Sequence, residues 1–571
     1  GFIFSTIATQ VAGKQSNTIT LQAVETDLVT GACAPLLVDN QTVEMAVECI
    51  SPSNCGSAIS QINTTAVSTN ISGAVSSYDN VVLDFGDSTD SDGDFTFQYD
   101  DAGSLKIWAK TQLLLANGTG SGNYISGGSS SFVVLPAGFC LEPSEANWQC
   151  TVPGLTANCS AFKQAGDNFN LAVSAKIYEA SGDYCSVAST INFSGSVNLS
   201  HNLISPTSAS GGDAGTLSVS SAALTNGTTT LAMNLSDMGA YTLTAGGNSY
   251  LGVSLPSNDS QNIGRFYAKD FFIQSSTSAI YSDASGSFSY TGQLQNNGDG
   301  SIGYSVAPSF NYRVRGFSGQ TLKNYLTPFA STPTVSATAS SSQLGSLGTS
   351  LSVVGVFSAG TITGPNASFE FTYTFSNADH FVFTRDANSL MAPFNNDMNI
   401  NISGFSEAID SITLANGPVV VAGSGGEIRY GRLNVQNAYG PETSAVSQSW
   451  EMQYFNGTAF RINSIDNVTA YNLADIGTIT VTDVGDSSAP LLNTDSSASS
   501  SAGITGSFSA GLLTVDWSAP LNGHFGNYLF PLSVDAWLQY DWTGSGNVDP
   551  QGNVSFGQYR GHDNIIYWKE I

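Results

Sequence analysis

A run of acidic residues from Asp84 to Asp94 carries the densest set of possible metal ligands in the chain. Carboxylate oxygens at this density suit Ca²⁺, a hard cation with oxygen ligands. An EF-hand loop needs glycine at its sixth position, but counting from Asp90 that position is Phe95, which already begins a strand pattern. Two hypotheses stay open: a Ca²⁺ site, or a solvated acidic hairpin tip without a cofactor. The candidate ligands are Asp87, Asp90, Asp92 and Asp94.

The 7 cysteines all lie in the first third of the chain, at Cys33, Cys49, Cys55, Cys140, Cys150, Cys159 and Cys185. The spacings Cys49-x5-Cys55 and Cys150-x8-Cys159 differ from the C-x2-4-C spacing of zinc sites. They suit short loops closed by disulfide bonds, which form in oxidising compartments. We therefore predict disulfides at these four positions, with buried free thiols as the alternative. The connectivity stays open, and the odd count leaves at least one cysteine unpaired within the chain.

Residues for catalysis are sparse. The 4 histidines stand singly, without an H-x-x-x-H pair, and no G-x-S-x-G nucleophile elbow occurs. A glycosidase needs two carboxylates that face each other across a cleft, a relation that the sequence cannot display. We predict that the protein is not an enzyme, and a secreted hydrolase is only the third hypothesis.

The elements around these residues follow a period of two. Segments such as 18–24, 95–99 and 369–375 alternate apolar and polar residues, and clusters of Gly, Asn and Ser separate them. This alternation is typical of half-buried antiparallel strands. The sequence predicts an all-β protein.

Two copies of one turn pattern appear in the chain, Asp101-Ala102-Gly103 and Asp237-Met238-Gly239. In the second copy Tyr241 follows, which gives the tyrosine corner of an immunoglobulin-like sandwich, where the Tyr hydroxyl bonds back to the backbone. The first copy has Leu105 at the Tyr position, so it keeps the turn without the hydroxyl. A short third match begins at Asp475. The pattern predicts tandem immunoglobulin-like antiparallel β-sandwiches.

A second feature recurs at Ala12-Gly13, Ala165-Gly166 and Thr291-Gly292, where a small pair leads into a strand. Its spacing predicts serial sandwiches with junctions near Pro136, Ala268 and Gly425. The predicted domains are residues 1–137, 138–267, 268–424 and 425–571, the first with an N-terminal strand.

The composition argues against nucleic acid as a partner and favours an extracellular location. With 16 Lys and Arg against 44 Asp and Glu, the net charge is −28, so the basic clusters that bind nucleic acid are missing. No apolar run reaches the roughly 20 residues that span a bilayer. Gly1 is not an initiator Met, so we expect a processed mature protein or a fragment. Together with the cysteines, this predicts an extracellular or bacterial cell-surface location.

Motifs in the C-terminal quarter carry a family resemblance. They are Gly431 to Gly440, Gln453 to Gly457, Trp537 to Trp542, Phe556 to Gly561 and Ile565 to Glu570, with further matches at Phe132 to Phe139, Gly264 to Tyr267 and Phe288 to Gln293. They resemble the MshQ-like proteins, secreted proteins of the mannose-sensitive haemagglutinin type IV pilus system with a domain of unknown function. The resemblance spans nearly the whole chain and implies a pilus-associated or adhesive setting, without implying a chemistry.

The first ten residues form a strand pattern that suggests an assembly mechanism. Monomeric β-proteins often protect free sheet edges with Lys, and this chain has few Lys to place there. One hypothesis is that residues 1–10 add as a strand to a neighbouring subunit, as in donor-strand complementation. The alternative is that this strand closes its own first domain. The assembly residues would be Gly1, Phe2, Ile3, Phe4 and Ile7.

The predicted function is therefore structural or adhesive: a pilus-associated or filament-forming subunit that associates with itself or with other subunits. The alternative is a glycan-binding adhesin that stacks surface sugars on Trp537, Tyr540 and Trp542. Alternate aromatic residues of a strand also fill cores, which is the plainer interpretation of these three.

Overall fold

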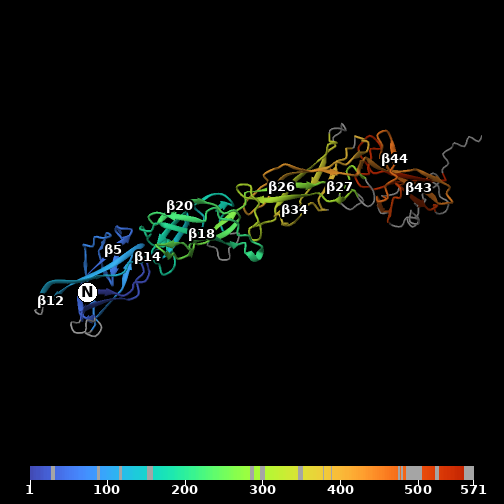
Figure 1. Ribbon diagram of the computed structural model, residues 1–571. Helices are drawn as coiled ribbons and strands as arrows, with labels where there is room; N and C mark the ends of the chain where they lie inside the picture. Colours follow the sequence, from blue (N-terminus) through green and yellow to red (C-terminus); the bar gives the residue numbers. More distant parts are fainter. Residues whose placement is uncertain are drawn as a thin grey trace, which may run out of the picture. The chain divides into compact units, whose positions relative to one another are not determined.

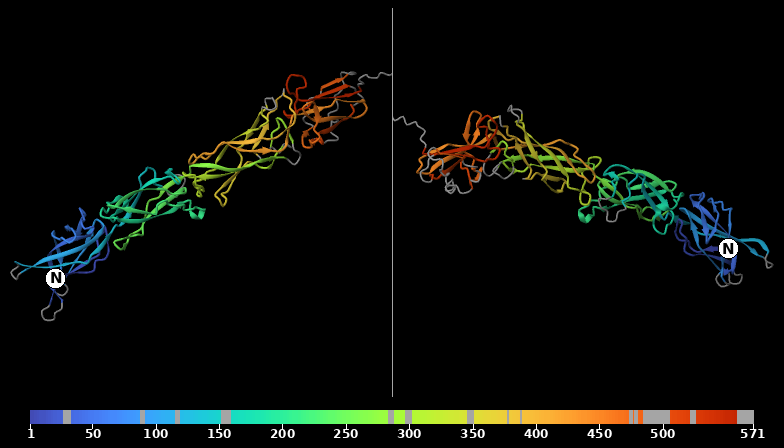
Figure 2. Two further views of the ribbon diagram at one scale, coloured as in Figure 1. Left: turned by 45° about the horizontal axis from the view of Figure 1, so that its top comes forward. Right: turned by 180° about the vertical axis from the view of Figure 1, so that it is seen from behind.

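The computed structural model describes residues 1–26, 33–86, 91–114, 119–150, 159–282, 288–295, 302–344, 351–376, 378–386, 389–472, 476, 480–483, 505–520 and 526–557. The described residues form β-strands and two short 3-10 helices, η1 (Tyr184–Ser186) and η2 (Ser208–Ser210). The all-β prediction is confirmed, and Figures 1 and 2 show the strand-rich architecture from three sides. The chain divides into two compact units, residues 1–269 with 314–331, and residues 270–313 with 332–571.

The first sandwich lies in the first unit. Its main sheet has the order β2-β14-β12-β5-β8, with β13 on β12 and β9 on β5, and β1-β3-β10 forms a smaller sheet. Alternation along β3 buries Ile19, Leu21 and Ala23, as the period of two predicts. The strands are β1 (Phe2–Phe4), β2 (Gln10–Val11), β3 (Ile19–Thr26), β4 (Cys33–Pro35), β5 (Asn40–Ser51), β6 (Ser60–Ile62), β7 (Thr65–Ala66), β8 (Thr69–Asn70), β9 (Asp79–Asp84), β10 (Asp92–Phe95), β11 (Phe97–Tyr99), β12 (Gly103–Leu114), β13 (Gly120–Gly128) and β14 (Phe132–Leu135).

The second sandwich completes the first unit with sheets β15-β17-β20 and β16-β25-β21-β18-β19. Its core contains Tyr241, whose hydroxyl donates to the backbone carbonyls of Asp237 and Met238, both at 3.2 Å. The predicted tyrosine corner is therefore present. The strands are β15 (Gly138–Pro143), β16 (Lys163–Gln164), β17 (Phe169–Lys176), β18 (Gly195–Ser205), β19 (Ser221–Leu224), β20 (Thr228–Met233), β21 (Gly239–Gly246), β22 (Ser249–Tyr250), β23 (Val253–Ser254), β24 (Asn258–Asp259) and β25 (Ile263–Tyr267).

The third sandwich contains the sheets β26-β30-β34-β33 and β31-β37-β38. Phe405 of β37 lies 4.8 Å from Phe271 and 4.7 Å from Tyr312 between ring centres, which places an aromatic cluster between the two sheets. The strands are β26 (Asp270–Thr277), β27 (Ala279–Tyr281), β28 (Phe288–Tyr290), β29 (Tyr304–Val306), β30 (Ser309–Arg315), β31 (Thr334–Ser340), β32 (Val353–Val356), β33 (Thr361–Thr363), β34 (Phe371–Thr374), β35 (His380–Phe383), β36 (Phe394–Asn395), β37 (Asn399–Ser406), β38 (Val419–Val421), β39 (Gly423–Ser424) and β40 (Glu427–Arg429).

The fourth sandwich pairs the sheet β41-β43-β44, with β48 on β43, and the sheet β42-β50-β49-β46. Two buried indoles, Trp450 and Trp517, both donate to Oε1 of Gln448 at 3.0 Å, so their polar edges are satisfied inside the core. The strands are β41 (Gly431–Val435), β42 (Ala438–Gly440), β43 (Val446–Phe455), β44 (Phe460–Ile462), β45 (Ala470–Asn472), β46 (Thr480–Asp483), β47 (Thr505–Ser507), β48 (Leu512–Trp517), β49 (Gly526–Pro531) and β50 (Gln551–Phe556).

One parallel strand pair recurs in all four sandwiches: β2 with β14, β16 with β25, β28 with β40, and β42 with β50. Because the other named pairings within the sandwiches are mostly antiparallel, these pairs mark equivalent positions along the chain. The predicted domain limits stay a prediction. Phe288 and Tyr290, which fall in the predicted third domain, pack into the core of the fourth sandwich.

Candidate functional site

The contacts between successive sandwiches form the candidate site. At the first junction, the turn Ala12-Gly13 lies against the loop that follows β17. The backbone carbonyl of Ala12 accepts the N–H of Tyr178 at 2.8 Å. Gly13 has φ +74°, and a Cβ built there would lie 2.9 Å from Cβ of Ile177. The backbone conformation and the neighbouring domain therefore both favour glycine at this position.

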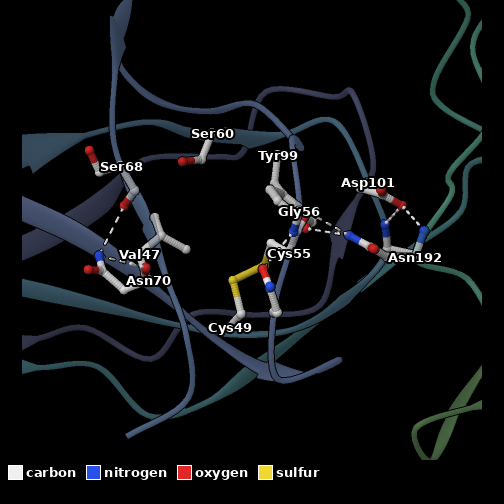
Figure 3. Close-up of a disulfide and its surroundings, with 12 residues drawn as sticks. Val47, Cys49, Cys55, Gly56, Ser60, Ser68, Asn70, Tyr99, Asp101 and Asn192 are labelled. Atoms are coloured by element: carbon white, nitrogen blue, oxygen red, sulfur yellow. Dashed lines mark hydrogen bonds between the residues drawn. A yellow bond between two sulfur atoms is a disulfide. The ribbon is translucent and has the colours of Figure 1, made fainter. Parts of the chain in front are cut away.

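A buried carboxylate completes this junction (Figure 3). Asp101 is only 2% exposed, and its Oδ1 accepts the N–H of Ala102 at 2.7 Å and the N–H of Asn192, in the second sandwich, at 2.9 Å. The side chain of Asn192 donates to the carbonyl of Cys55 and to the Tyr99 hydroxyl, both at 3.2 Å. The loop that presents the Cys55 carbonyl is closed by the Cys49–Cys55 disulfide.

The second junction repeats the turn contact within the first unit. The backbone carbonyl of Ala165 accepts the N–H of Phe317 at 2.8 Å and Nε2 of Gln320 at 3.0 Å. Gly166 has φ +84°, and a Cβ there would lie 2.4 Å from Nε2 of Gln320. The segment 314–331 therefore packs on the second sandwich, although it lies between two strands of the third.

The buried carboxylate also recurs. Asp237 is 3% exposed and accepts the N–H of Lys323 at 3.0 Å and the N–H of Asn324 at 3.2 Å. The side chain of Asn324 donates to the carbonyls of Asp213 and Met238 at 2.7 and 2.9 Å. The Asp237–Asn324 arrangement thus matches the Asp101–Asn192 arrangement, with a carboxylate on the preceding sandwich and amide donors on the following loop.

Burial governs the electrostatics of both carboxyls. Desolvation raises the pKa of Asp101 against the hydrogen bonds that it accepts. Desolvation likewise raises the pKa of Asp237, to about 6. Nearby, Lys323 and Asp213 form an ion pair at 2.9 Å, which lowers the pKa of Asp213. These groups hold backbone donors in place, which is a mechanical role.

Sequence reasoning found the Asp-x-Gly turns and the small-Gly pairs, but it missed that both meet the neighbouring sandwich. It also missed Asn192 and Asn324. The available signal was an Asn in the loop that follows β17 and in the loop that follows β30. This signal is weak, because the chain is rich in Asn. The third turn match, at Asp475, lies outside the described residues.

The predicted assembly strand pairs within its own chain. β1 runs antiparallel to β3, with Phe2 opposite Ala23 and Phe4 opposite Leu21. Phe2 is 6% exposed and Ile7 is 9% exposed, whereas Ile3 is 49% exposed. The structure therefore shows the self-closing arrangement that the sequence left open, and exchange of this strand between copies stays a prediction.

Three disulfides join Cys49–Cys55, Cys140–Cys185 and Cys150–Cys159. Two of them are the short loops that the spacing predicts, and Cys140–Cys185 completes the set. The side chain of Cys33 lies outside the described residues. Glu142 lies close to the Cys140 and Cys185 sulfurs, but those sulfurs are joined to each other and so do not supply thiolate ligands.

The acidic run is only partly described. Asp87 and Asp90 lie outside the described residues, while Asp92 and Asp94 lie on β10. Asp94 accepts the Thr20 hydroxyl at 2.7 Å, a contact across the strand pair β10–β3. The Ca²⁺ hypothesis therefore stays a prediction.

Of the three predicted sugar-stacking residues, Trp537 lies apart from Tyr540 and Trp542, whose ring centres are 5.1 Å from each other. Trp537 stacks on Tyr290 with ring centres 5.4 Å apart, so it belongs to the junction between the third and fourth sandwiches. Tyr540 and Trp542 lie with Phe460 around the guanidinium of Arg432, which is 3.6, 4.7 and 4.6 Å from the Phe460, Tyr540 and Trp542 ring centres. Trp542 is 38% exposed. We call Arg432, Phe460, Tyr540 and Trp542 the aromatic–arginine patch.

The fold and its junctions define a protein of serial immunoglobulin-like β-sandwiches. Four successive domain models of one family cover the chain: the "Domain of unknown function (DUF6701), first Ig-like domain" at residues 1–128, and the second, third and fourth DUF6701 domains at residues 135–234, 237–428 and 429–571. The chain belongs to the DUF6701 family. The limit between the second and third models precedes β21 and β25, which pair with β18 and β16 of the second sandwich.

Several solved structures are similar to the chain. Invasin, a bacterial integrin-binding protein, aligns at 10% identity over 97% of this chain and 79% of its own, with a TM-score of 0.27. The Yersinia pseudotuberculosis adhesin InvE aligns at 15% identity over 49% of this chain and 58% of its own, with a TM-score of 0.17. The CupB6 tip adhesin from Pseudomonas aeruginosa aligns at 9% identity over 51% of this chain and 98% of its own, with a TM-score of 0.15. Among curated proteins no sequence match was found.

Proposed function

We propose that the protein is an extracellular structural and adhesive protein of the bacterial cell surface. The observation that carries this proposal is the repeated junction, in which a buried carboxylate at the end of a sandwich binds backbone N–H groups of a loop that comes later in the chain. Linkers without such contacts allow free relative motion of domains. Sandwiches tied by buried hydrogen bonds suit transmission of force along a chain.

A further feature supports an extracellular location. The three disulfides suit an oxidising compartment. Among the described residues, no helix is long and apolar enough to cross a membrane. The MshQ-like resemblance adds the finer proposal of a pilus-associated or filament-forming subunit, whose partners are copies of itself or other subunits.

Exchange of the N-terminal strand is the proposed assembly mechanism. Deletion of residues 1–10 should abolish oligomers while the monomer stays folded, as measured by light scattering and circular dichroism. The matched control is Val82→Ser, which changes an exposed side chain on β9 of the same sandwich and should leave both the oligomers and the folded monomer as in wild type. A monomer that collapses on deletion would instead assign the strand to its own domain alone.

Negative-stain microscopy of the purified protein tests the structural role directly. Fibres or end-to-end assemblies would support the filament proposal, and single particles at high concentration would contradict it. The adhesive role is tested separately, by binding of the protein to whole bacteria and to host-cell surfaces.

The second candidate function is glycan binding at the aromatic–arginine patch. The observation that favours it is the 38% exposure of Trp542 beside Tyr540 and Phe460, because exposed aromatic faces stack on sugar rings. A glycan array should then show binding that Trp542→Ala abolishes and that Trp108→Ala, in the first sandwich, retains. Absence of binding to all glycans would contradict it.

A further inference from the structure

The junction between the third and fourth sandwiches has the same backbone register as the first two. In each, the Gly of the small-Gly pair donates its N–H to a carbonyl of the same sandwich: Gly13 to Tyr99, Gly166 to Leu235 and Gly292 to Phe383, at 2.8, 2.7 and 2.7 Å. The residue before that Gly donates to the last residue of the parallel strand: Ala12 to Leu135, Ala165 to Tyr267 and Thr291 to Arg429. The three junctions can therefore be aligned position by position.

This alignment places Arg385 where the first two junctions have a buried aspartate. Asp101 lies two residues after Tyr99, Asp237 two residues after Leu235, and Arg385 two residues after Phe383. The guanidinium Nη2 of Arg385 donates to the backbone carbonyls of Gly431 and Gln539, both in the fourth sandwich, at 2.8 and 2.6 Å. A cation that donates to carbonyls thus replaces an anion that accepts from amides.

The positions of donors and acceptors in the rest of the third junction are also reversed relative to the first two. Asp466 of the fourth sandwich is fully buried, and its Oδ2 accepts the hydroxyl of Tyr290, from β28 of the third sandwich, at 2.8 Å. The buried carboxylate has therefore moved from the preceding sandwich to the following one. An Asn is present here too: the side-chain amide of Asn463 donates to the Tyr290 hydroxyl at 2.6 Å.

Direction of donation thus separates the junctions. At the first two junctions, the loop that packs on the end of the sandwich supplies the donors to the buried carboxylate. Bonds in the other direction are those of the Asp213 N–H to Oδ1 of Asn324 and of Lys269 to the carbonyls of Arg315 and Phe317. At the third, Arg385 and Tyr290 of the preceding sandwich are donors, and Asn463 is the exception.

We propose that the charged side chain at the end of the first, second and third sandwiches, Asp101, Asp237 and Arg385, specifies which kind of neighbour each of them accepts. The ends of the first and second sandwiches fit a loop that presents backbone N–H groups. The end of the third sandwich fits a domain that presents carbonyl oxygens and a carboxylate. The proposal rests on these junctions alone, so it stands whether or not the protein proves adhesive.

The physical basis is the cost of a buried polar group without a partner. A carboxylate placed against the Gly431 and Gln539 carbonyls would leave acceptors facing acceptors, and a guanidinium placed against the Lys323 and Asn324 amides would leave donors facing donors. Each unmade buried hydrogen bond costs more than the net gain of a formed one. A sandwich with the wrong charge would therefore reject its neighbour.

Hydrogen–deuterium exchange of the full chain tests this proposal. Asp237→Arg should speed exchange in residues 316–331 by about tenfold or more and leave residues 455–469 unchanged, while Arg385→Asp should do the reverse. Arg385→Lys keeps a donor of the same charge and should stay close to wild type, whereas Arg385→Met should exchange faster in residues 455–469. This order distinguishes donation from simple filling of space.

Matched charge reversals at exposed positions serve as controls. Asp259→Arg and Arg461→Asp change surface residues of the second and fourth sandwiches and should leave exchange in both segments as in wild type, apart from the amides next to residue 461 itself. Circular dichroism shows whether each variant folds, and the milder Arg385→Met and Arg385→Lys pair decides the matter if the reversals do not. Equal exchange in Arg385→Met and Arg385→Lys, or wild-type exchange in Arg385→Asp, would overturn the proposal.

Discussion

At the residue scale, Asp237 makes the second junction sensitive to pH. Its pKa is raised from 3.8 to about 6 by burial, so the folded protein binds more protons than the unfolded chain between about pH 4 and pH 6. Stability from this group is therefore highest below pH 4 and falls as pH rises through 6, by up to about 3 kcal/mol.

The measurement is the melting temperature of wild type and Asp237→Asn across pH 4 to 7. As pH rises, the melting temperature of wild type should fall relative to that of Asp237→Asn. Asp259→Asn, at an exposed carboxylate, is the control and should run parallel to wild type. A melting temperature of wild type that rises relative to that of Asp237→Asn with increasing pH would contradict the raised pKa of Asp237.

Gly166 and Gly252 form a matched pair for testing the second junction. Both have φ +84°, but a Cβ at Gly166 meets Gln320 at 2.4 Å, whereas nothing lies within 4 Å of a Cβ at Gly252. Gly252→Ala should cost only the left-handed backbone strain, about 1 kcal/mol. Gly166→Ala should cost more, because the Gln320 amide must move away from the Ala165 and Ser236 carbonyls to which it donates, and it should also speed exchange in residues 316–331. Equal losses of melting temperature, with unchanged exchange, would show that the turn does not sense its neighbour.

At the element scale, the disulfides differ in the loop that they close. Cys140–Cys185 spans a sequence separation of 45 and Cys49–Cys55 a separation of 6. Loop-closure entropy predicts a loss of about 4 kcal/mol for the paired Cys→Ser variant of the first and about 2 kcal/mol for that of the second.

Chemical denaturation of the two double variants measures these losses. The short disulfide has a second readout, because its loop presents the Cys55 carbonyl to Asn192. Its removal should raise exchange near Asn192 even though the global loss is smaller. A larger global loss for the short loop would contradict the entropic ranking.

Many of the structural elements could be predicted from the local sequence. The strand pattern at residues 18–24 gave β3, the Asp-x-Gly-x-Tyr pattern gave the corner at Tyr241, and the Cys spacing gave the two short loops. The junctions did not follow, because the donors to Asp101 and Asp237 are backbone N–H groups, which every residue except proline carries. The equivalence of Arg385 with Asp237 depends on register between distant strands, which no local pattern encodes.

At the scale of the whole molecule, the net charge of −28 makes the folded state sensitive to salt. Self-repulsion of like charges opposes compaction, and salt screens it over about 10 Å at 0.1 M. The melting temperature at pH 7 should rise between 10 and 200 mM NaCl. Near pH 4, where carboxyls protonate, the same salt increase should have a much smaller effect. A fall in melting temperature with salt at pH 7 would show that ion pairs outweigh repulsion.

The segment 314–331 also limits how this protein can be cut and recombined. Its first two residues are the end of β30, but the segment packs with the second sandwich, where the backbone N–H groups of Lys323 and Asn324 bind the Asp237 carboxylate. A truncation near residue 268 would strip those partners from Asp237, so the second sandwich is incomplete without residues that are encoded beyond its own last strand. Recombination therefore cannot exchange these sandwiches as independent units. A gene duplication that preserved the second junction would have had to copy the second sandwich together with the part of the third that extends to residue 331.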